Sequence, residues 1–178
     1  MKVLGVYLQA DLKWNSQVSN MLKKANKRMH ILRSLIPFRL PNDDLLVIYK
    51  GYIRPLVEYA VPVWHPGLTI AQTNKLEGIQ KRALKLILGH RYQSYASAMA
   101  LTSLESLQER RVNICRKFGK SLLNSKEFQH WLPQPRLEPR QTRNSAIMYP
   151  PRCKTERYRC SPIPFLVRTL NEMMKDST

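Results

Sequence analysis

Residues 43–66 read DDLLVIYKGYIRPLVEYAVPVWHP, the densest apolar and aromatic stretch of the chain. Apolar positions recur every three to four residues, which indicates a helix with one buried face. These positions are Leu45, Leu46, Ile48, Tyr49, Tyr52, Ile53, Leu56, Tyr59 and Trp64. We therefore expect this stretch to be the core element on which flanking helices pack.

Helix signals mark the ends and the middle of this stretch. Asn42 is a favourable N-cap, and Asp43 and Asp44 would then lie in the first turn, where acids interact well with the helix dipole. Pro55 lacks an amide hydrogen and clashes with the preceding turn, so the helix should kink or restart there. It should end at a cluster of breakers, Pro62, Pro66 and Gly67.

Composition limits the possible classes of function. A chain of 178 residues with 43% hydrophobic content has enough apolar side chains for one folded domain. Its 30 Lys and Arg against 12 Asp and Glu give a net charge of +18, which favours a polyanionic partner, nucleic acid before anionic membrane. Three cysteines form no disulfide framework, and we see neither a membrane-spanning run nor a signal peptide. We therefore expect an intracellular protein, nuclear or cytoplasmic.

Residues 2–8, KVLGVYL, are β-branched and apolar, which predicts one short strand. Everything downstream is patterned as helix, so this strand would have no partner. We take this as a hint that the chain is cut from a longer protein.

Three amphipathic helices should surround the core stretch. In residues 15–33 the apolar positions fall in one arc: Trp14, Val18, Met21, Leu22, Ala25, Met29 and Leu32. A second helix buries Leu76, Ile79, Ala83, Leu84, Leu86 and Ile87 and ends at Gly89. Residues 102–105, TSLE, match a capping box and predict a third helix that buries Leu104, Leu107, Ile114, Cys115, Phe118 and Leu122.

The opposite faces of these helices are basic. One such face is usually only solvated, but three with few acids between them could follow a phosphate backbone. The candidate nucleic-acid-binding residues are Lys23, Lys24, Lys27, Arg28, Lys81, Arg82, Lys85, Arg116, Lys117 and Lys120. Arg111 lies inside the apolar arc instead, which leaves two interpretations: an arginine at the core edge with its head in water, or a partly buried contact with phosphate or carboxylate.

The last part of the chain is different in composition. Residues 132–164 hold seven of the twelve prolines and seven basic residues, so we expect an extended or disordered linker over 132–152. Ser161 and Pro162 should cap a short final helix over 163–174, with Phe165, Leu166, Leu170 and Met173 as its apolar side.

Signals for catalysis are weak. Asp43 and Asp44 are explained by the helix start, and no Gly-rich phosphate loop is present. Cys153 and Cys160 have no short Cys or His pair beside them, so they do not suggest a zinc site. We expect no catalytic residues, no metal and no cofactor in this chain.

The blocks YKGYIRPLVEYAVPVWHPGL and KLEGIQKRALKLILG closely resemble the region after the catalytic palm in reverse transcriptases of non-LTR (LINE-type) retrotransposons. The opening KVLGVYLQADLKWNSQV is similar to the strand and loop that close that palm, and RCKTERYRCSPIPFLVRTLN to the end of such reading frames. The resemblance covers nearly the whole chain. It implies the thumb and post-thumb of an RNA-directed DNA polymerase, with Leu4 and Gly5 as the primer-grip turn.

This resemblance implies a mainly α fold and a division of the chain. Residues 1–14 would be the end of the palm, 15–131 a helical thumb and post-thumb domain, 132–162 a Pro/Arg-rich linker, and 163–178 a short terminal helix. The Asp-Asp turn that holds the catalytic Mg²⁺ would belong to a missing palm, so this chain alone should be inactive. Its partners would be the RNA template, the DNA primer, their duplex, and the missing palm and fingers.

Two functions of different classes remain. The first is binding of primer–template duplex without sequence preference, by a truncated reverse transcriptase fragment. The second is a stand-alone module that meets a protein or an acidic membrane surface, which Tyr52, Tyr59 and Trp64 would favour if they were exposed.

Overall fold

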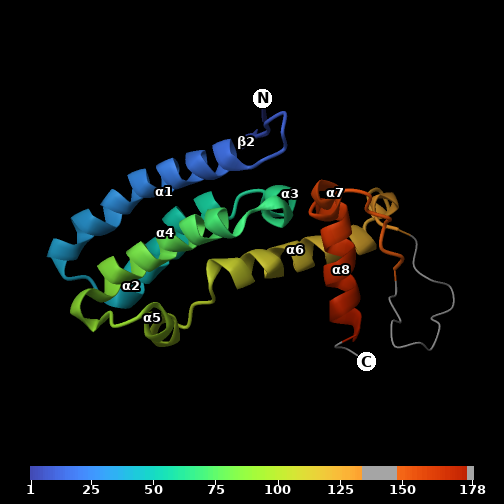
Figure 1. Cartoon of the computed structure of the whole chain (residues 1–178). Coiled ribbons are helices and arrows are strands. Elements are labelled where there is room, and N and C mark those ends of the chain that lie inside the picture. The colour runs from blue at the N-terminus through green and yellow to red at the C-terminus, as the bar shows by residue number, and fades with distance from the viewer. Residues whose placement is uncertain (134–147, 176–178) are drawn as a thin grey trace. The chain divides into compact units, whose positions relative to one another are not determined.

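The protein is mainly helical, as the sequence predicts (Figure 1). The structure, a computed structural model, describes residues 1–133 and 148–175. The chain packs as two compact units: unit 1 comprises Met1–Ala60 and Leu68–Arg110, and unit 2 comprises Val61–Gly67 and Arg111–Thr178. This division follows packing, whereas the division expected above follows the family resemblance and the local composition, so the expected boundaries stay predictions.

The N-terminal segment is a hairpin and not a single strand. β1 (Lys2–Val3) pairs antiparallel with β2 (Val6–Tyr7), with Lys2 opposite Tyr7. Leu4 and Gly5 form the turn with φ values of 46° and 86°. A two-residue hairpin turn of type I′ needs positive φ at both central residues, and glycine adopts it freely. The predicted partnerless strand is therefore wrong, because its partner lies within the same seven residues.

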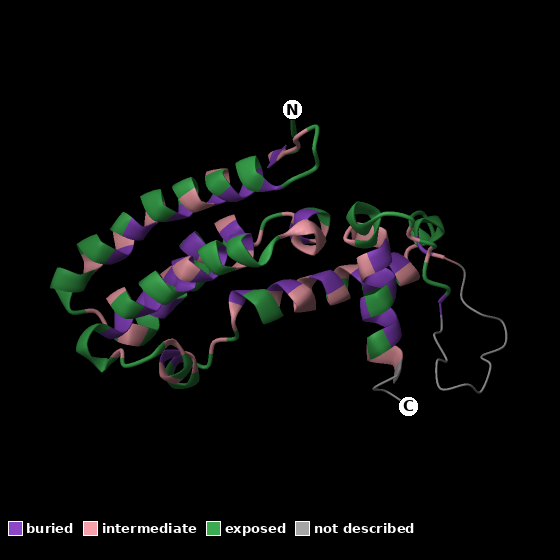
Figure 2. Ribbon diagram, viewed as in Figure 1, coloured by how far each residue is buried: buried purple, intermediate pink, exposed green. Residues whose placement is uncertain are grey.

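α1 (Asn15–Leu35) confirms the predicted first helix and extends it by two residues. Figure 2 shows its buried and exposed residues on opposite sides along its length. The predicted arc is buried except for Leu22, which is half-buried. The arc also contains Gln17, whose Oε1 accepts a hydrogen bond from the Tyr7 amide at 2.9 Å and so joins the hairpin to α1.

The core stretch begins with α2 (Asn42–Ile48), which continues as a π-helical turn (Tyr49–Ile53) and a 3-10 turn (Arg54–Val57). The predicted break at Pro55 is confirmed, and the π turn comes just before it. Asn42 is the first helical residue, not the N-cap: Pro41 holds that position, and no side chain caps the helix. Asp43 and Asp44 lie in the first turn, as expected.

The chain passes from unit 1 to unit 2 within this stretch. Ala60 has a left-handed backbone (φ 54°), and α3 (Val61–Trp64) follows it. Pro62 lies inside α3, so the helix tolerates it in its first turn and ends instead at the 3-10 turn His65–Gly67. Seven side chains of the stretch are buried: Leu45, Leu46, Tyr49, Ile53, Val57, Val61 and Trp64.

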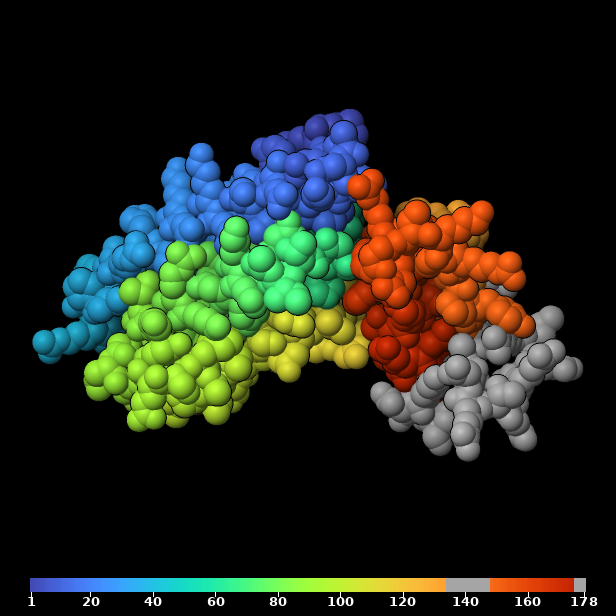
Figure 3. Space-filling model, in the orientation of Figure 1, coloured from blue at the N-terminus to red at the C-terminus, as the bar shows by residue number. Residues whose placement is uncertain are grey.

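α4 (Ile70–Leu88) packs along α1 and also contacts α2, all within unit 1. In Figure 3 the blue atoms of α1 border the green atoms of the α4 region. The helix ends at Gly89 with positive φ, as predicted, and its apolar arc is buried except for half-buried Leu86. A capping box of Thr69 and Gln72, which we did not predict, begins it.

The predicted capping box at residues 102–105 is wrong. Those residues end an unpredicted helix, α5 (Tyr95–Thr102), and Ser103 closes it in a left-handed conformation. α6 (Leu107–Asn124) begins four residues later. There the Ser106 hydroxyl accepts from the Glu109 amide at 3.1 Å, and Glu109 Oε2 accepts from the Ser106 amide at 3.1 Å. The same motif, shifted by four residues, therefore begins the helix.

Unit 2 packs α6 against the last helix, α8 (Pro162–Lys175), which was predicted over 163–174. Gly119 of α6 lies so close to Leu170 that an added Cβ would meet Leu170 Cδ1 at 3.1 Å. The predicted arcs are only partly buried: Leu104, Ile114, Phe118, Phe165 and Met173 are half-buried.

The predicted linker contains one described helix, α7 (Glu156–Arg159). Its residues 134–147 lie outside the described structure. On either side of that gap Leu132 and Met148 are buried, and Asn171 of α8 exchanges two hydrogen bonds with the Met148 backbone, at 2.9 and 3.0 Å. Leu132 and Met148 are therefore packed, and the described residues 149–152 form no helix or strand. Most of the segment expected to be extended or disordered, 132–152, lies outside the described residues.

Candidate nucleic-acid interface

α1 carries the first basic set. Lys23, Lys24 and Lys27 are exposed, because at 100° per residue they lie away from the buried arc. Arg28 differs from them: it is half-buried, its Nη1 donates to the Tyr52 carbonyl oxygen at 2.8 Å, and its guanidinium lies 4.1 Å from the Tyr52 ring centroid. Arg28 is thus anchored to the core stretch, while the three lysines project into solvent.

α4 carries the second set, and all three of its members, Lys81, Arg82 and Lys85, are exposed. The Lys81 ammonium lies 5.0 Å from the centroid of the Tyr95 ring. The Lys85 ammonium lies 5.3 Å from that of Tyr92. Both distances fit cation–π contacts, so two of these cations are positioned by aromatic rings from the segment that follows α4.

The only acid of α4, Glu77, is turned into the protein. It is 8% exposed, and its Oε1 accepts hydrogen bonds from the Tyr95 hydroxyl and, at 2.9 Å, from the Leu107 amide. Burial and the hydrogen bond with Glu77 raise the pKa of Tyr95 above its usual range. The solvent-facing side of α4 therefore carries no negative charge.

Gln80 lies beside Glu77 in the same polar network. Its Oε1 accepts from the Tyr49 hydroxyl at 2.8 Å, and its Nε2 donates to the Tyr95 hydroxyl oxygen at 3.0 Å and to the Glu105 carbonyl oxygen at 2.8 Å. Each of these groups is thereby compensated for its loss of water. Sequence reasoning missed both residues. The available signal was their position: Gln80 and Glu77 fall within the helix arc of Leu76, Ile79 and Ala83.

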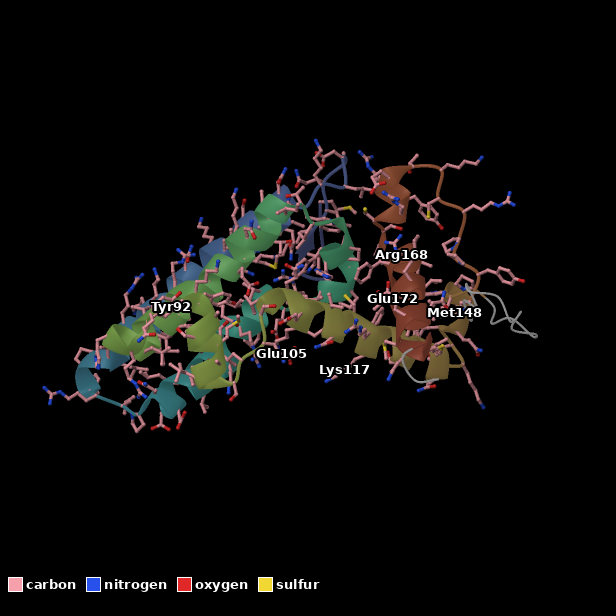
Figure 4. All side chains as sticks on the ribbon, turned by 60° about the horizontal axis from the view of Figure 1, so that its bottom comes forward. Tyr92, Glu105, Lys117, Met148, Arg168 and Glu172 are labelled. Carbon is pink, nitrogen blue, oxygen red and sulfur yellow. The ribbon has the colours of Figure 1, made fainter. Side chains whose placement is uncertain are left out.

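α6 carries the third set, which belongs to unit 2. Lys117, labelled in Figure 4, and Lys120 are exposed. Arg116 is half-buried, and its Nη1 donates to Asn113 Oδ1 at 3.0 Å. The basic sets therefore lie on separate helices, two in unit 1 and one in unit 2. Their union into one clamp remains a prediction.

Two carboxylates in the described ranges pair with arginines outside the three basic sets. Glu58 pairs with Arg110 and, at 3.4 Å, with Arg54, and Glu156 pairs with Arg159 at 2.5 Å. Glu77 and Glu109 are used in the hydrogen bonds described above. Within residues 1–133 and 148–175, no carboxylate forms an ion pair with any of the ten candidate basic residues.

The hairpin turn places the predicted primer-grip residues at the surface. Leu4 is 87% exposed, and its carbonyl oxygen accepts a hydrogen bond from the Tyr59 hydroxyl at 2.6 Å. A Cβ on Gly5 would lie 3.3 Å from Tyr59 Cε1. Glycine is thus required both by the positive φ and by the tyrosine against it. A role of this turn in gripping a primer remains a prediction.

Arg111 is fully buried, so an arginine at the core edge with its head in water is the wrong interpretation. Its charge acts on two neighbours in unit 2. Burial, together with the Arg111 charge, lowers the pKa of His65 to about 4. Burial raises the pKa of the Cys115 thiol to about 12, with Arg111 acting in the opposite direction.

The aromatic residues that favoured a protein-binding or membrane-binding module are only partly available. Trp64 is fully buried, which contradicts the expectation that it could be exposed. Tyr52 is 42% exposed, but its ring contacts the Arg28 guanidinium. Tyr59 is 53% exposed, but its hydroxyl donates to the hairpin turn. Each of the two tyrosines is therefore engaged in a contact within unit 1.

No three His, Cys, Asp or Glu side chains of the described residues come together as a possible metal site. None of the described helices has an apolar stretch long enough to span a lipid bilayer.

Comparisons with protein family models, with curated proteins and with solved structures found no match to this chain.

Proposed function

We propose that this chain binds double-stranded nucleic acid, including an RNA–DNA primer–template duplex, without sequence preference. In this proposal it is thumb-like and related to the reverse transcriptases of non-LTR retrotransposons that its sequence resembles. The carrying observation is that ten basic side chains on α1, α4 and α6 have no carboxylate partner among the described residues. Phosphate would supply the missing counter-charge.

Electrostatics support this choice of partner. A net charge of +18 repels itself at low ionic strength, and a polyanion relieves that repulsion. Each phosphate that a lysine or arginine neutralises releases a condensed counterion, which gives a duplex a gain in entropy that isolated anions do not provide.

The chemistry of the sets supports binding without base readout. Specific readout commonly relies on bidentate arginine, asparagine or glutamine at base edges. Seven of the ten residues are lysines, which act on phosphate as point charges, and the Arg28 guanidinium is already held by Tyr52. We therefore expect similar affinity for duplexes of unrelated sequence.

A salt series with a labelled RNA–DNA duplex tests the proposal. Replacing Lys81, Arg82 and Lys85 together by Gln should lower affinity and reduce the magnitude of the slope of log K against log salt by about 2–3, since each phosphate contact contributes about 0.9. The analogous α1 and α6 sets are tested in the same way. Lys50→Gln and Lys126→Gln, two exposed lysines outside the sets, serve as controls for net charge.

Two results would oppose the proposal: no binding at low salt, or equal losses in the set variants and in charge-matched controls. Primer extension with Mg²⁺ should show no incorporation by this chain alone. Pull-downs with and without nuclease separate the protein-binding alternative, because partners that persist after nuclease favour it, and binding to anionic vesicles separates the membrane alternative.

A further inference from the structure

Glu77 and Lys81 stand four residues apart on α4, with the acid on the N-terminal side. This is the favourable spacing and order for an ion pair on a helix. No such pair forms: the Lys81 ammonium lies over the Tyr95 ring at 5.0 Å, and the Tyr95 hydroxyl donates to Glu77. Tyr95 therefore contacts both charged groups: the Lys81 ammonium lies over its ring, and the Glu77 carboxylate accepts from its hydroxyl.

The position of Tyr95 is determined at its oxygen. That oxygen donates to Glu77 Oε1 and accepts from Gln80 Nε2 at 3.0 Å. Because both partners project from α4, the tyrosine is held against that helix at two points. Its ring face is then the surface on which the Lys81 side chain lies.

Glu77 would attract a cation if one could reach it. Its Oε2 is buried and has no hydrogen-bond partner, so the carboxylate has an unused acceptor. A buried acceptor without a partner is costly, and a flexible lysine one turn away on the same helix is a ready donor. The ring contact keeps the ammonium at the surface instead.

Lys85 repeats the arrangement one turn further along α4. Its ammonium lies 5.3 Å from the ring centroid of Tyr92, the residue labelled in Figure 4. Both tyrosines follow Gly89, whose positive φ ends α4 and reverses the chain, and Ser94 then caps α5 at Tyr95. The reversal of the chain after Gly89 thus brings the rings of Tyr95 and Tyr92 back to Lys81 and Lys85, which are four residues apart on α4.

We propose that Tyr95 is a positioning residue that keeps Lys81 from pairing with Glu77, so that Lys81 and Lys85 are presented side by side as a phosphate-binding pair. The positioning is a property of the protein alone. Its use in binding phosphate rests on the proposed function.

Duplex binding and lysine modification test this together. Tyr95→Leu removes the ring, and we expect it to weaken duplex binding about two- to fivefold, as much as Lys81→Gln does. The double change Tyr95→Leu/Glu77→Gln should recover that loss. Glu77→Gln alone should change binding little, because Lys81 is already apart from Glu77. Tyr95→Phe keeps the ring but loses the hydroxyl that holds it against α4, so its binding should lie between that of the original protein and that of Tyr95→Leu.

Modification of lysines by an acylating reagent, read by mass spectrometry without nucleic acid, gives an independent readout. Tyr95→Leu should slow the modification of Lys81 about twofold relative to Lys50, and Glu77→Gln should restore it. Should the duplex not bind while these rates change as stated, the proposed function fails and the positioning role stands.

The proposal is overturned if Lys81 reacts equally fast with leucine or tyrosine at position 95, or if Glu77→Gln fails to restore the rate in Tyr95→Leu. Circular dichroism establishes that each variant is folded. If Tyr95→Leu fails to fold, Glu77→Gln in the original protein decides. A marked acceleration of Lys81 modification in that variant would show that the ion pair already exists, and no change supports its absence.

Discussion

α4 and α6 follow the same sequence plan, an apolar stripe opposite lysines and arginines, yet they bury opposite charges. α4 buries Glu77, which accepts hydrogen bonds from Tyr95 and Leu107. α6 buries Arg111, whose charge adds to the effect of burial in lowering the pKa of His65 and opposes the rise that burial causes in the pKa of Cys115. An amphipathic pattern thus predicts where the apolar residues go but not which charged residue goes with them.

α4 and α6 also differ in how closely other side chains approach their glycines. Nothing lies within 4 Å of a Cβ added at Gly78 of α4, whereas at Gly119 of α6 three atoms of Leu170 lie within 3.1–3.3 Å. The same residue type therefore has two different reasons to be present. On α6 it allows close packing, and on α4 the structure shows no steric reason for it.

The largest expected effect is at Arg111. Arg111→Ala should destabilise the protein by about 3–5 kcal/mol, because it empties the space of a large, fully buried side chain. Arg111→Met fills most of that space without a charge and should cost much less. Urea unfolding measures both. Equal losses for the two variants would show that the charge, not the volume, carries the effect.

The next effect is a pH dependence at His65. Its folded pKa of about 4 lies below the ordinary value of 6.5, so between these values the unfolded chain takes up a proton that the folded one does not. The free energy of unfolding should have its full value above pH 6.5 and should fall by about 2–3 kcal/mol as the pH is lowered to 4. His65→Leu should flatten this part of the profile relative to the original protein. An unchanged slope would mean that other groups produce it.

A smaller effect is expected at Glu77. Glu77→Ala leaves the Tyr95 hydroxyl and the Leu107 amide without their acceptor and should cost about 1–3 kcal/mol. Glu77→Gln keeps one acceptor oxygen and should cost less. Thermal unfolding compares them, with Glu127→Ala, an exposed acid, as the control. A larger loss at Glu77 than at Arg111 would reverse the contrast between the helices.

The smallest effect compares the two glycines directly. Gly78→Ala should stabilise the protein by about 0.5–1 kcal/mol through helix propensity. Gly119→Ala should destabilise it by about 1 kcal/mol, because the added methyl group presses on Leu170, a side chain that is only 1% exposed. Paired denaturation curves give both signs. The same sign at the two positions would show that α6 accommodates the extra carbon.

Much of the candidate interface could be predicted from the sequence. Lys23, Lys24 and Lys27 are exposed as predicted, since a period of 3.6 residues alone separates them from the buried arc of α1. Arg28 has the same signal but a different environment, because Tyr52, 24 residues away in the chain, lies against it. Periodicity describes one helix, and it contains no information about a neighbour.

The capping-box motif predicted helix starts less reliably than hydrophobic periodicity predicted helices. The capping-box pattern occurs at residues 102–105 and again, with serine and glutamate, at 106–109, and only the second begins a helix. The first belongs to α5, a helix too short and too uniformly apolar to show a period. Likewise the seven residues of the hairpin look like one strand until Leu4 and Gly5 take positive φ.

By itself the sequence determined the helical class, the spans of α1 and α8, the end of α4, the break at Pro55 and the cationic faces, because these follow from local periodicity and backbone chemistry. Only the tertiary structure decided that Glu77 and Arg111 are buried, that Trp64 is covered, and that Tyr92 and Tyr95 meet Lys85 and Lys81. A charged or aromatic side chain is stable in either environment, and the partners brought to it by packing determine which one it occupies.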